Sequence, residues 1–276
     1  MLAKFKYFTW AASRMPFADH ACPACASPQT RLLARKYLVT SLYRCERCEL
    51  MFRVPKNEPG RAERFYQKEY KQGFTSDCPS AEELSQLVAC SFSGTPKDYS
   101  SYIKFLAAAG VSPGSTIYDF GCSWGYGSWQ MQKSGYDVLS YEISAPRAAY
   151  AQQKLGCRMS KPGELSASVD CLFSAHVLEH MDNPRELWEM AARILKPTGK
   201  VVLFFPNGAL QREGIHSTWG QVHPLLLDSA AVRVMAQASG FRALTYTSPF
   251  DLNKVMLRAE DGAQAGDELG VVASRV

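Results

Sequence analysis

The feature that most constrains this chain is a strand that ends in a glycine-containing turn and continues into a helix. The stretch reads Thr116-Ile-Tyr-Asp-Phe-Gly-Cys-Ser-Trp-Gly-Tyr-Gly127. Gly121 and Gly125 permit a sharp turn and a close approach to a ligand, because they lack a Cβ. The first N–H groups of the following helix have no partner within the helix and can bind a ligand. In a doubly wound sheet, such a turn lies at the carboxyl end of the first strand, where ligands bind.

From Val111 onward, strand candidates alternate with helix candidates. The strand candidates are 116–120, 137–141, 157–160, 169–174, 200–205, 243–247 and 254–258, and the helix candidates are 127–134, 145–155, 184–195 and 229–239. Strands separated by helices predict parallel βαβ units with right-handed crossovers. The last two strands have only a short link, so we expect them to pair antiparallel at one edge. The pattern therefore predicts an α/β fold with a seven-stranded, mostly parallel sheet.

An acidic residue follows the glycine turn at the end of the second predicted strand. Glu142 comes twenty-three residues after Asp119, and a carboxylate there can accept hydrogen bonds from both ribose hydroxyls of an adenosine. Asp119, directly before the turn, would repel a pyrophosphate but suits a cationic amino group, and Trp124 occupies the turn itself. These features favour S-adenosylmethionine over a dinucleotide. A tight turn without a ligand, beside an ordinary surface glutamate, is the alternative.

Three segments together resemble class I S-adenosylmethionine-dependent methyltransferases. Asp119-Phe-Gly-Cys-Ser-Trp-Gly125 resembles the first motif of that family, with Ser123 in place of the middle glycine. The segments 173–184 and 193–207 resemble the regions after the fourth strand and around the fifth strand, with Thr198 where glycine is usual. The resemblance covers about 111–260 and implies a Rossmann-like core.

The resemblance also implies roles for single residues. Those expected to bind the cofactor are Asp119, Gly121, Ser123 and Gly125 around its methionine part, Glu142 at its ribose, and Ser174, Ala175 and His176 near its methyl group. The implied reaction is an in-line displacement at the sulfonium carbon, in which positioning supplies much of the rate. A general base is needed only if the acceptor carries a proton that must leave.

Several histidines are candidates for such a base. His180, His216 and His223 have the right intrinsic pKa, and His223 precedes a region that faces the acceptor in the resembled family, so we place it over the methyl-transfer site. His180 is the second catalytic candidate, although a structural role is the simpler interpretation of each histidine. The stretch His176-Val-Leu-Glu-His180 also matches the H-x-x-E-H peptidase motif. We reject that interpretation because His176 falls at the end of a predicted strand rather than on a helix.

Two C-x-x-C pairs near the N-terminus have the spacing of a structural zinc site. Cys22 and Cys25 are separated from Cys45 and Cys48 by nineteen residues. The predicted module spans 18–55 and resembles a zinc ribbon, although Ala26 and Glu49 stand where glycine commonly follows the second cysteine of each turn. We expect a helical connector or cap over 56–110, the cofactor-binding core over 111–260 and a flexible tail over 261–276.

The charge distribution and the cysteine content indicate the kind of partner and the cellular compartment. Residues 1–72 hold fourteen Lys+Arg against six Asp+Glu, whereas the remainder is net acidic. This balance indicates either a surface for an anionic partner, such as a nucleotide sugar, a phosphate or RNA, or a solvated surface. Nine cysteines with scattered spacing predict reduced thiols in the cytoplasm, and no run is apolar enough to form a transmembrane segment.

Three functions remain open on the sequence alone. The first is methylation of a sugar, nucleotide sugar or secondary metabolite. The second is an RNA methyltransferase whose basic zinc module binds RNA. The third is a binding protein that has kept the fold and lost the activity, which Ser123 and Trp124 in the turn make conceivable.

Overall fold

The structure is a computed structural model that describes residues 2–58, 60, 77–209, 219–220, 222–250 and 266–276. Within these residues, no helix has the length and apolar character that crossing a bilayer requires. The predicted strand at 254–258, the aromatic and basic run at 61–71 and His216 lie outside the described residues.

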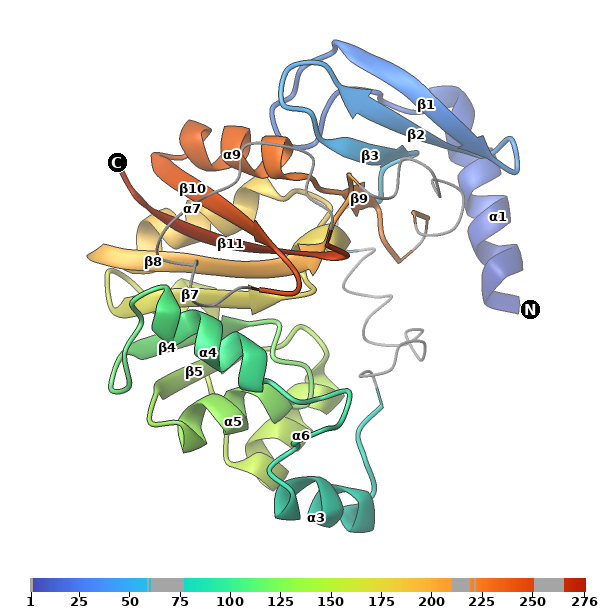
Figure 1. Cartoon of the computed structure of the whole chain (residues 1–276). Helices are drawn as coiled ribbons and strands as arrows, with labels where there is room; N and C mark the ends of the chain where they lie inside the picture. The colour runs from blue at the N-terminus through green and yellow to red at the C-terminus, as the bar shows by residue number, and fades with distance from the viewer. Residues whose placement is uncertain (1, 59, 61–76, 210–218, 221, 251–265) are drawn as a thin grey trace.

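The core is a seven-stranded sheet with helices on both faces (Figure 1). Its strand order is β10-β11-β8-β7-β4-β5-β6, with β4 to β8 parallel and the last two strands antiparallel. The strands are β4 (Thr116–Phe120), β5 (Asp137–Tyr141), β6 (Arg158–Met159), β7 (Val169–Ala175), β8 (Leu195–Pro206), β10 (Phe241–Thr247) and β11 (Glu268–Arg275). The predicted seven-stranded, mostly parallel α/β fold is confirmed.

The helices between these strands follow the sequence pattern closely. They are α5 (Tyr126–Lys133), α6 (Ala145–Leu155), α7 (Arg185–Ile194) and α9 (Ser229–Ala238), with the short 3-10 helices η2 (Pro162–Glu164) and η3 (Leu178–His180). One face of α7 carries Leu187, Ala191 and Ile194 at helical spacing, and all three are buried. The Asp228 side chain accepts a hydrogen bond from Ala231 N and so caps α9, as predicted.

The predicted flexible tail at 261–276 is wrong for its last part. Residues 268–275 form β11, which pairs with β8 on one side and β10 on the other. Leu269, Val271 and Ala273 are buried in the core. Leu269, Val271 and Ala273 stand at every second position, which is the period of a strand. β10 thus has an antiparallel partner, but that partner is β11, and the predicted partner at 254–258 lies outside the described residues.

The N-terminal module is a small antiparallel sheet that a core segment completes. Its strands are β1 (Thr30–Lys36), β2 (Thr40–Cys45) and β3 (Met51–Val54), after α1 (Leu2–Arg14) and η1 (Met15–Phe17). A fourth strand, β9 (Leu225–Leu226), comes from the far end of the chain and pairs with β3. Residues 35–43 span the end of β1, the hairpin turn in which Tyr37 and Leu38 adopt positive φ, and the first part of β2.

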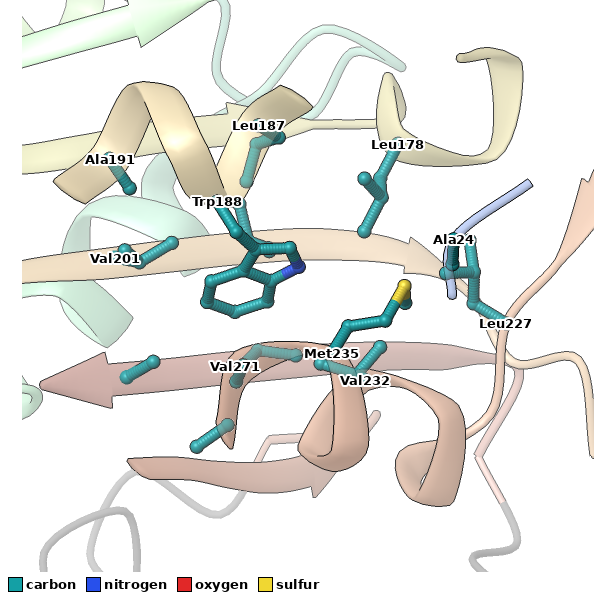
Figure 2. Packing of buried hydrophobic residues seen from close by; sticks show 14 of the residues in the cluster. Ala24, Leu178, Leu187, Trp188, Ala191, Val201, Leu227, Val232, Met235 and Val271 are labelled. Carbon is teal, nitrogen blue, oxygen red and sulfur yellow. The ribbon is translucent and has the colours of Figure 1, made fainter. Parts of the chain in front are cut away.

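The module also packs on the core through apolar side chains. Cys45, Cys48 and Phe52 belong to the same buried cluster as Trp188 of α7 and Met235 of α9. Figure 2 shows Ala24 of the module beside Leu227 and near Leu178 and Met235. Burial of this kind contributes roughly 25 cal/mol per Å² of apolar surface, so module and core stabilise each other.

Two described helices precede the core, in the stretch expected to be a helical connector. They are α3 (Ala81–Ala89) and α4 (Ser100–Ala108). Ser80 caps α3 in a capping box with Glu83. Phe105 of α4 packs edge-on against Phe204 of β8, 4.9 Å between ring centroids, which fixes α4 on one face of the sheet near the carboxyl ends of its strands.

Candidate functional site

The turn between β4 and α5 has the geometry that its glycines require. Gly121 and Gly125 have φ of 90° and 92°. A Cβ on Gly121 would lie 2.3 Å from Val177 Cγ2, and one on Gly125 would lie 2.8 Å from both Ala151 Cβ and Cys157 Sγ. The glycines are therefore needed for close packing inside the protein as well as for the turn itself.

Ser123 stands at the left-handed position where the family motif has glycine. Its φ is 52°, a conformation that costs an L-residue about 1–2 kcal/mol. The backbone N–H of Ser123 donates to Glu142 Oε2 at 3.0 Å, which helps to hold the residue in place. The turn forms with serine in it.

Glu142 joins the turn to the end of β5. Its Oε2 accepts from Ser123 N, and its Oε1 accepts from Ser144 N at 2.8 Å. An ionised carboxylate has about four acceptor sites, so each oxygen keeps one for a ligand. Burial raises the pKa of Glu142, although these backbone N–H groups and Arg147 oppose the shift. Glu142 lines the cavity described below, in the position expected for binding two adjacent hydroxyls.

Asp119, in contrast, lies behind the cavity wall. It is only 2% exposed, and it accepts a hydrogen bond of 2.5 Å from Ser128 Oγ, which in turn accepts one from Ser140 Oγ. Burial raises the pKa of Asp119 to about 7, while the bond from Ser128 opposes that shift. Gly125 and Ser174 are likewise absent from the lining, and the Ser174 hydroxyl donates to Phe120 O at 2.7 Å. These three predicted site residues support the turn from within.

A cavity of about 1280 Å³ opens at the carboxyl ends of the parallel strands. Here the strand order reverses between β4 and β7, which is where ligands bind in doubly wound sheets. Ligand cavities commonly measure about 300–1000 Å³, so this one has room for a cofactor and an acceptor together. It brings together seven of the predicted site residues: Gly121, Ser123, Glu142, Ala175, His176, His180 and His223.

His176 lies at the end of β7, in a network that the sequence did not reveal. It adopts a φ of 56°, and its Nε2 is 2.8 Å from Glu268 Oε1 of β11. Tyr102 of α4 donates to the same oxygen at 2.5 Å. Burial lowers the pKa of His176, but the carboxylates of Glu179 and Glu268 outweigh it and raise the pKa to about 10. Glu268 was missed because it lay in the expected tail, and Tyr102 because it lay in the expected helical connector.

The two candidate bases, His180 and His223, lie close to Glu179. His180 and His223 lie with their ring centroids 4.7 Å apart, and the Nδ1 of His180 is 2.7 Å from Val222 O. The buried Glu179 has a lowered pKa, because the nearby His180 and His176 outweigh the effect of burial. Glu179 and His180 lie on η3, whereas His176 follows the strand β7. Since His176 and His180 do not share a helix, the grounds for rejecting the peptidase motif are confirmed.

The four cysteines of the module converge on one point. Their sulfur atoms all lie within 4.8 Å of one another, with Cys22–Cys48 at 3.4 Å and Cys25–Cys45 at 3.5 Å, and all four thiols are free. A tetrahedral zinc with bonds of about 2.3 Å separates its sulfurs by about 3.8 Å. The donor set therefore fits a structural zinc ion.

The two cysteine turns are near copies of each other. Ala26 N donates to Cys22 O at 2.9 Å, and Glu49 N donates to Cys45 O at 3.1 Å. Ala26 and Glu49 adopt positive φ of 56° and 64°. The turn geometry that glycine would favour thus forms without it.

Comparisons with known proteins agree with this geometry. Residues 118–203 match the family model of the methyltransferase domain, and these residues carry the glycine turn, Glu142 and His176. No curated protein matches the chain. A crystal structure of a TehB-like S-adenosylmethionine-dependent methyltransferase from Corynebacterium glutamicum shares the fold, with a TM-score of 0.50 and 19% identity over 71% of this chain and 96% of that one.

Two further methyltransferase structures are similar at lower scores. One, from Mesorhizobium loti, has a TM-score of 0.46 and 16% identity over 63% of this chain and 98% of that one. The other, from Archaeoglobus fulgidus, has a TM-score of 0.47 and 14% identity over 71% of this chain and 100% of that one. The similarity to the Corynebacterium structure shows the Rossmann-like methyltransferase fold. Together with the family match, it supports a class I S-adenosylmethionine-dependent methyltransferase.

Proposed function

We propose that this protein transfers a methyl group from S-adenosylmethionine to a small or medium-sized metabolite, such as a sugar, a nucleotide sugar or a secondary metabolite. The observation that carries the proposal is Glu142, held by two backbone N–H groups at the end of β5 beside the glycine turn. The family match over this same stretch supports it.

Different residues around the turn would bind different parts of the cofactor. The free acceptor sites of Glu142 suit the ribose hydroxyls, and the backbone near Gly121 and Ser123 suits the methionine part. Ala175 and His176, at the end of β7, would lie near the methyl group. The cofactor supplies an activated methyl carbon, and the cavity walls orient the acceptor for in-line attack. His223 and His180 are the candidates for removing an acceptor proton.

The N-terminal module would hold one structural zinc ion through Cys22, Cys25, Cys45 and Cys48. A module of this size builds too small a core to fold without such a link. Its lysines and arginines would favour an anionic acceptor near the cavity mouth. The nine free thiols support a reducing, cytoplasmic location.

Calorimetry with the demethylated product S-adenosylhomocysteine tests the proposal directly. We expect saturable binding to zinc-loaded protein, no binding of NAD, and tritiated methyl transfer to a sugar-like or related small acceptor. Binding of NAD without binding of S-adenosylhomocysteine would refute the cofactor. Steeply salt-dependent RNA binding, with methyl transfer to RNA alone, would refute the acceptor class.

A further inference from the structure

A carboxylate and two imidazoles converge at one place in the cavity. Glu179 and His180 come from η3, and His223 comes from the segment before β9. One ligand atom from each, a carboxylate oxygen and two ring nitrogens, lie within 4.8 Å of one another. All three residues line the cavity.

The carboxylate of Glu179 is buried and makes no hydrogen bond, although two imidazoles lie near it. The residue is 3% exposed, and neither carboxylate oxygen has a hydrogen-bond partner. Two imidazole nitrogens lie near it, His176 Nδ1 at 3.5 Å and His180 Nε2 at 3.8 Å, and both distances are longer than a charge-assisted hydrogen bond. A buried carboxylate is costly unless it is paired, hydrogen-bonded or bound to a metal. A metal ion at this place would give the carboxylate the close partner that these two long contacts do not.

His180 is oriented as a metal ligand would be. Its Nδ1 is 2.7 Å from Val222 O, and since a carbonyl oxygen only accepts, Nδ1 carries the proton. In a neutral imidazole this leaves the lone pair on Nε2, the atom that faces Glu179. Histidines that bind metals commonly donate their other ring nitrogen in this way, which fixes the ring and its tautomer.

We propose that Glu179, His180 and His223 bind a divalent transition-metal ion, such as zinc or iron(II), within the methyltransferase cavity. Two imidazoles and one carboxylate are a donor set that both ions accept with coordination positions left open. Ligands at about 2.0–2.2 Å from one ion are about 3.3 Å apart, so a modest rotation of the side chains closes the site.

The role of this metal rests on the proposed function. An oxygen of a hydroxylated acceptor would take an open position, where the metal lowers the pKa of that hydroxyl. The hydroxyl proton leaves to solvent, and the acceptor oxygen forms a bond to the methyl carbon. The bond between sulfur and that carbon breaks, and its electron pair remains on sulfur. His180 and His223 are then metal ligands, and the acceptor requires no separate base.

Metal content of the full-length protein tests the site without any assay of activity. We expect wild-type protein reconstituted with cobalt(II) to bind about two equivalents, one at the four cysteines and one in the cavity. The first gives intense thiolate-to-cobalt absorption, whereas the second adds only the weaker bands of a nitrogen and oxygen site. Glu179→Gln and His223→Ala should each keep the thiolate absorption and lose the second equivalent.

His20→Gln is the matched control, because His20 is an exposed histidine that stacks on Tyr43 in the module, away from the cavity. This variant should keep both equivalents. The proposal is overturned if wild-type protein takes up only the thiolate-bound metal, which would mean that the histidines alone balance Glu179. It is also overturned if Glu179→Gln still binds two equivalents. S-adenosylhomocysteine binding is measured on the same samples, and its absence would refute the proposed function whatever the metal content.

Discussion

Replacement of Gly125 by alanine tests whether the glycine turn is held by internal packing. Gly125 and Gly156 both have positive φ, 92° and 67°. The new Cβ at Gly125 would lie 2.8 Å from Ala151 Cβ and Cys157 Sγ, against 3.4–4 Å for ordinary contacts, whereas a Cβ at Gly156 would meet nothing within 4 Å. The two substitutions therefore share the conformational cost and differ in crowding.

The expected free energies follow from that difference. A left-handed alanine costs about 1–2 kcal/mol, partly offset by about 0.4–1 kcal/mol from the stiffer unfolded chain. Gly156→Ala should therefore destabilise by about 1 kcal/mol. Crowding of a packed interior adds about 1–3 kcal/mol, so Gly125→Ala should cost about 2–4 kcal/mol in all.

Urea unfolding, followed by circular dichroism on zinc-loaded protein, measures both values through the shift in midpoint at constant slope. Gly125→Ala should also weaken binding of S-adenosylhomocysteine, because the turn that carries Ser123 must move. Equal losses of stability in the two variants would show that packing against α6 plays no part in the choice of glycine.

Three further outcomes are expected. Glu142→Gln should weaken S-adenosylhomocysteine binding about 10- to 100-fold, because a hydrogen bond to a charged group contributes about 1.5–3 kcal/mol. Calorimetry measures the affinity, with the exposed Glu164→Gln as the control. An unchanged affinity would exclude Glu142 from the ribose site. A carboxyl whose pKa is raised in the folded state stabilises the fold while it is protonated, and this contribution is lost as pH rises. The stabilisation from Asp119 should therefore fall by about 4 kcal/mol between pH 3.8 and 7. Asp119→Asn should flatten that part of the stability–pH curve, and identical curves would contradict the raised pKa. Zinc removal by a chelator should lower the melting temperature of the whole protein, since Cys45 packs in the same cluster as Trp188; scanning calorimetry that shows an unchanged core transition would contradict this coupling.

Local signals were enough to predict most of the core. The strands 116–120 and 137–141 and the helix 145–155 have the predicted bounds, because each carries its own hydrophobic period and its own turn residues. The cluster of four cysteines was also predicted from spacing alone, because these residues form two short C-x-x-C motifs. Ala26 and Glu49, which departed from the usual glycine, did not prevent the turns.

Contacts between distant segments could not be predicted in this way. Nothing local in 268–275 says that this strand lies between β8 and β10, and β9 joins the module from more than 170 residues away along the chain. The network of His176, Glu268 and Tyr102 depends on both β11 and α4 being in place. Glu268 and Tyr102 were therefore missed, and His176 was expected only beside the methyl group of the cofactor.

The sequence by itself determined the kinds of element, the glycine turn with its following acid, and the cysteine pairs, because each depends on residues that are near neighbours in the chain. The tertiary structure alone decided that Asp119 lies behind the cavity wall, that a core strand completes the module, and that Glu179, His180 and His223 meet. Those outcomes depend on which buried surfaces pack together. The segments that form such a surface are far apart in the chain, so their contacts cannot be read from neighbouring residues.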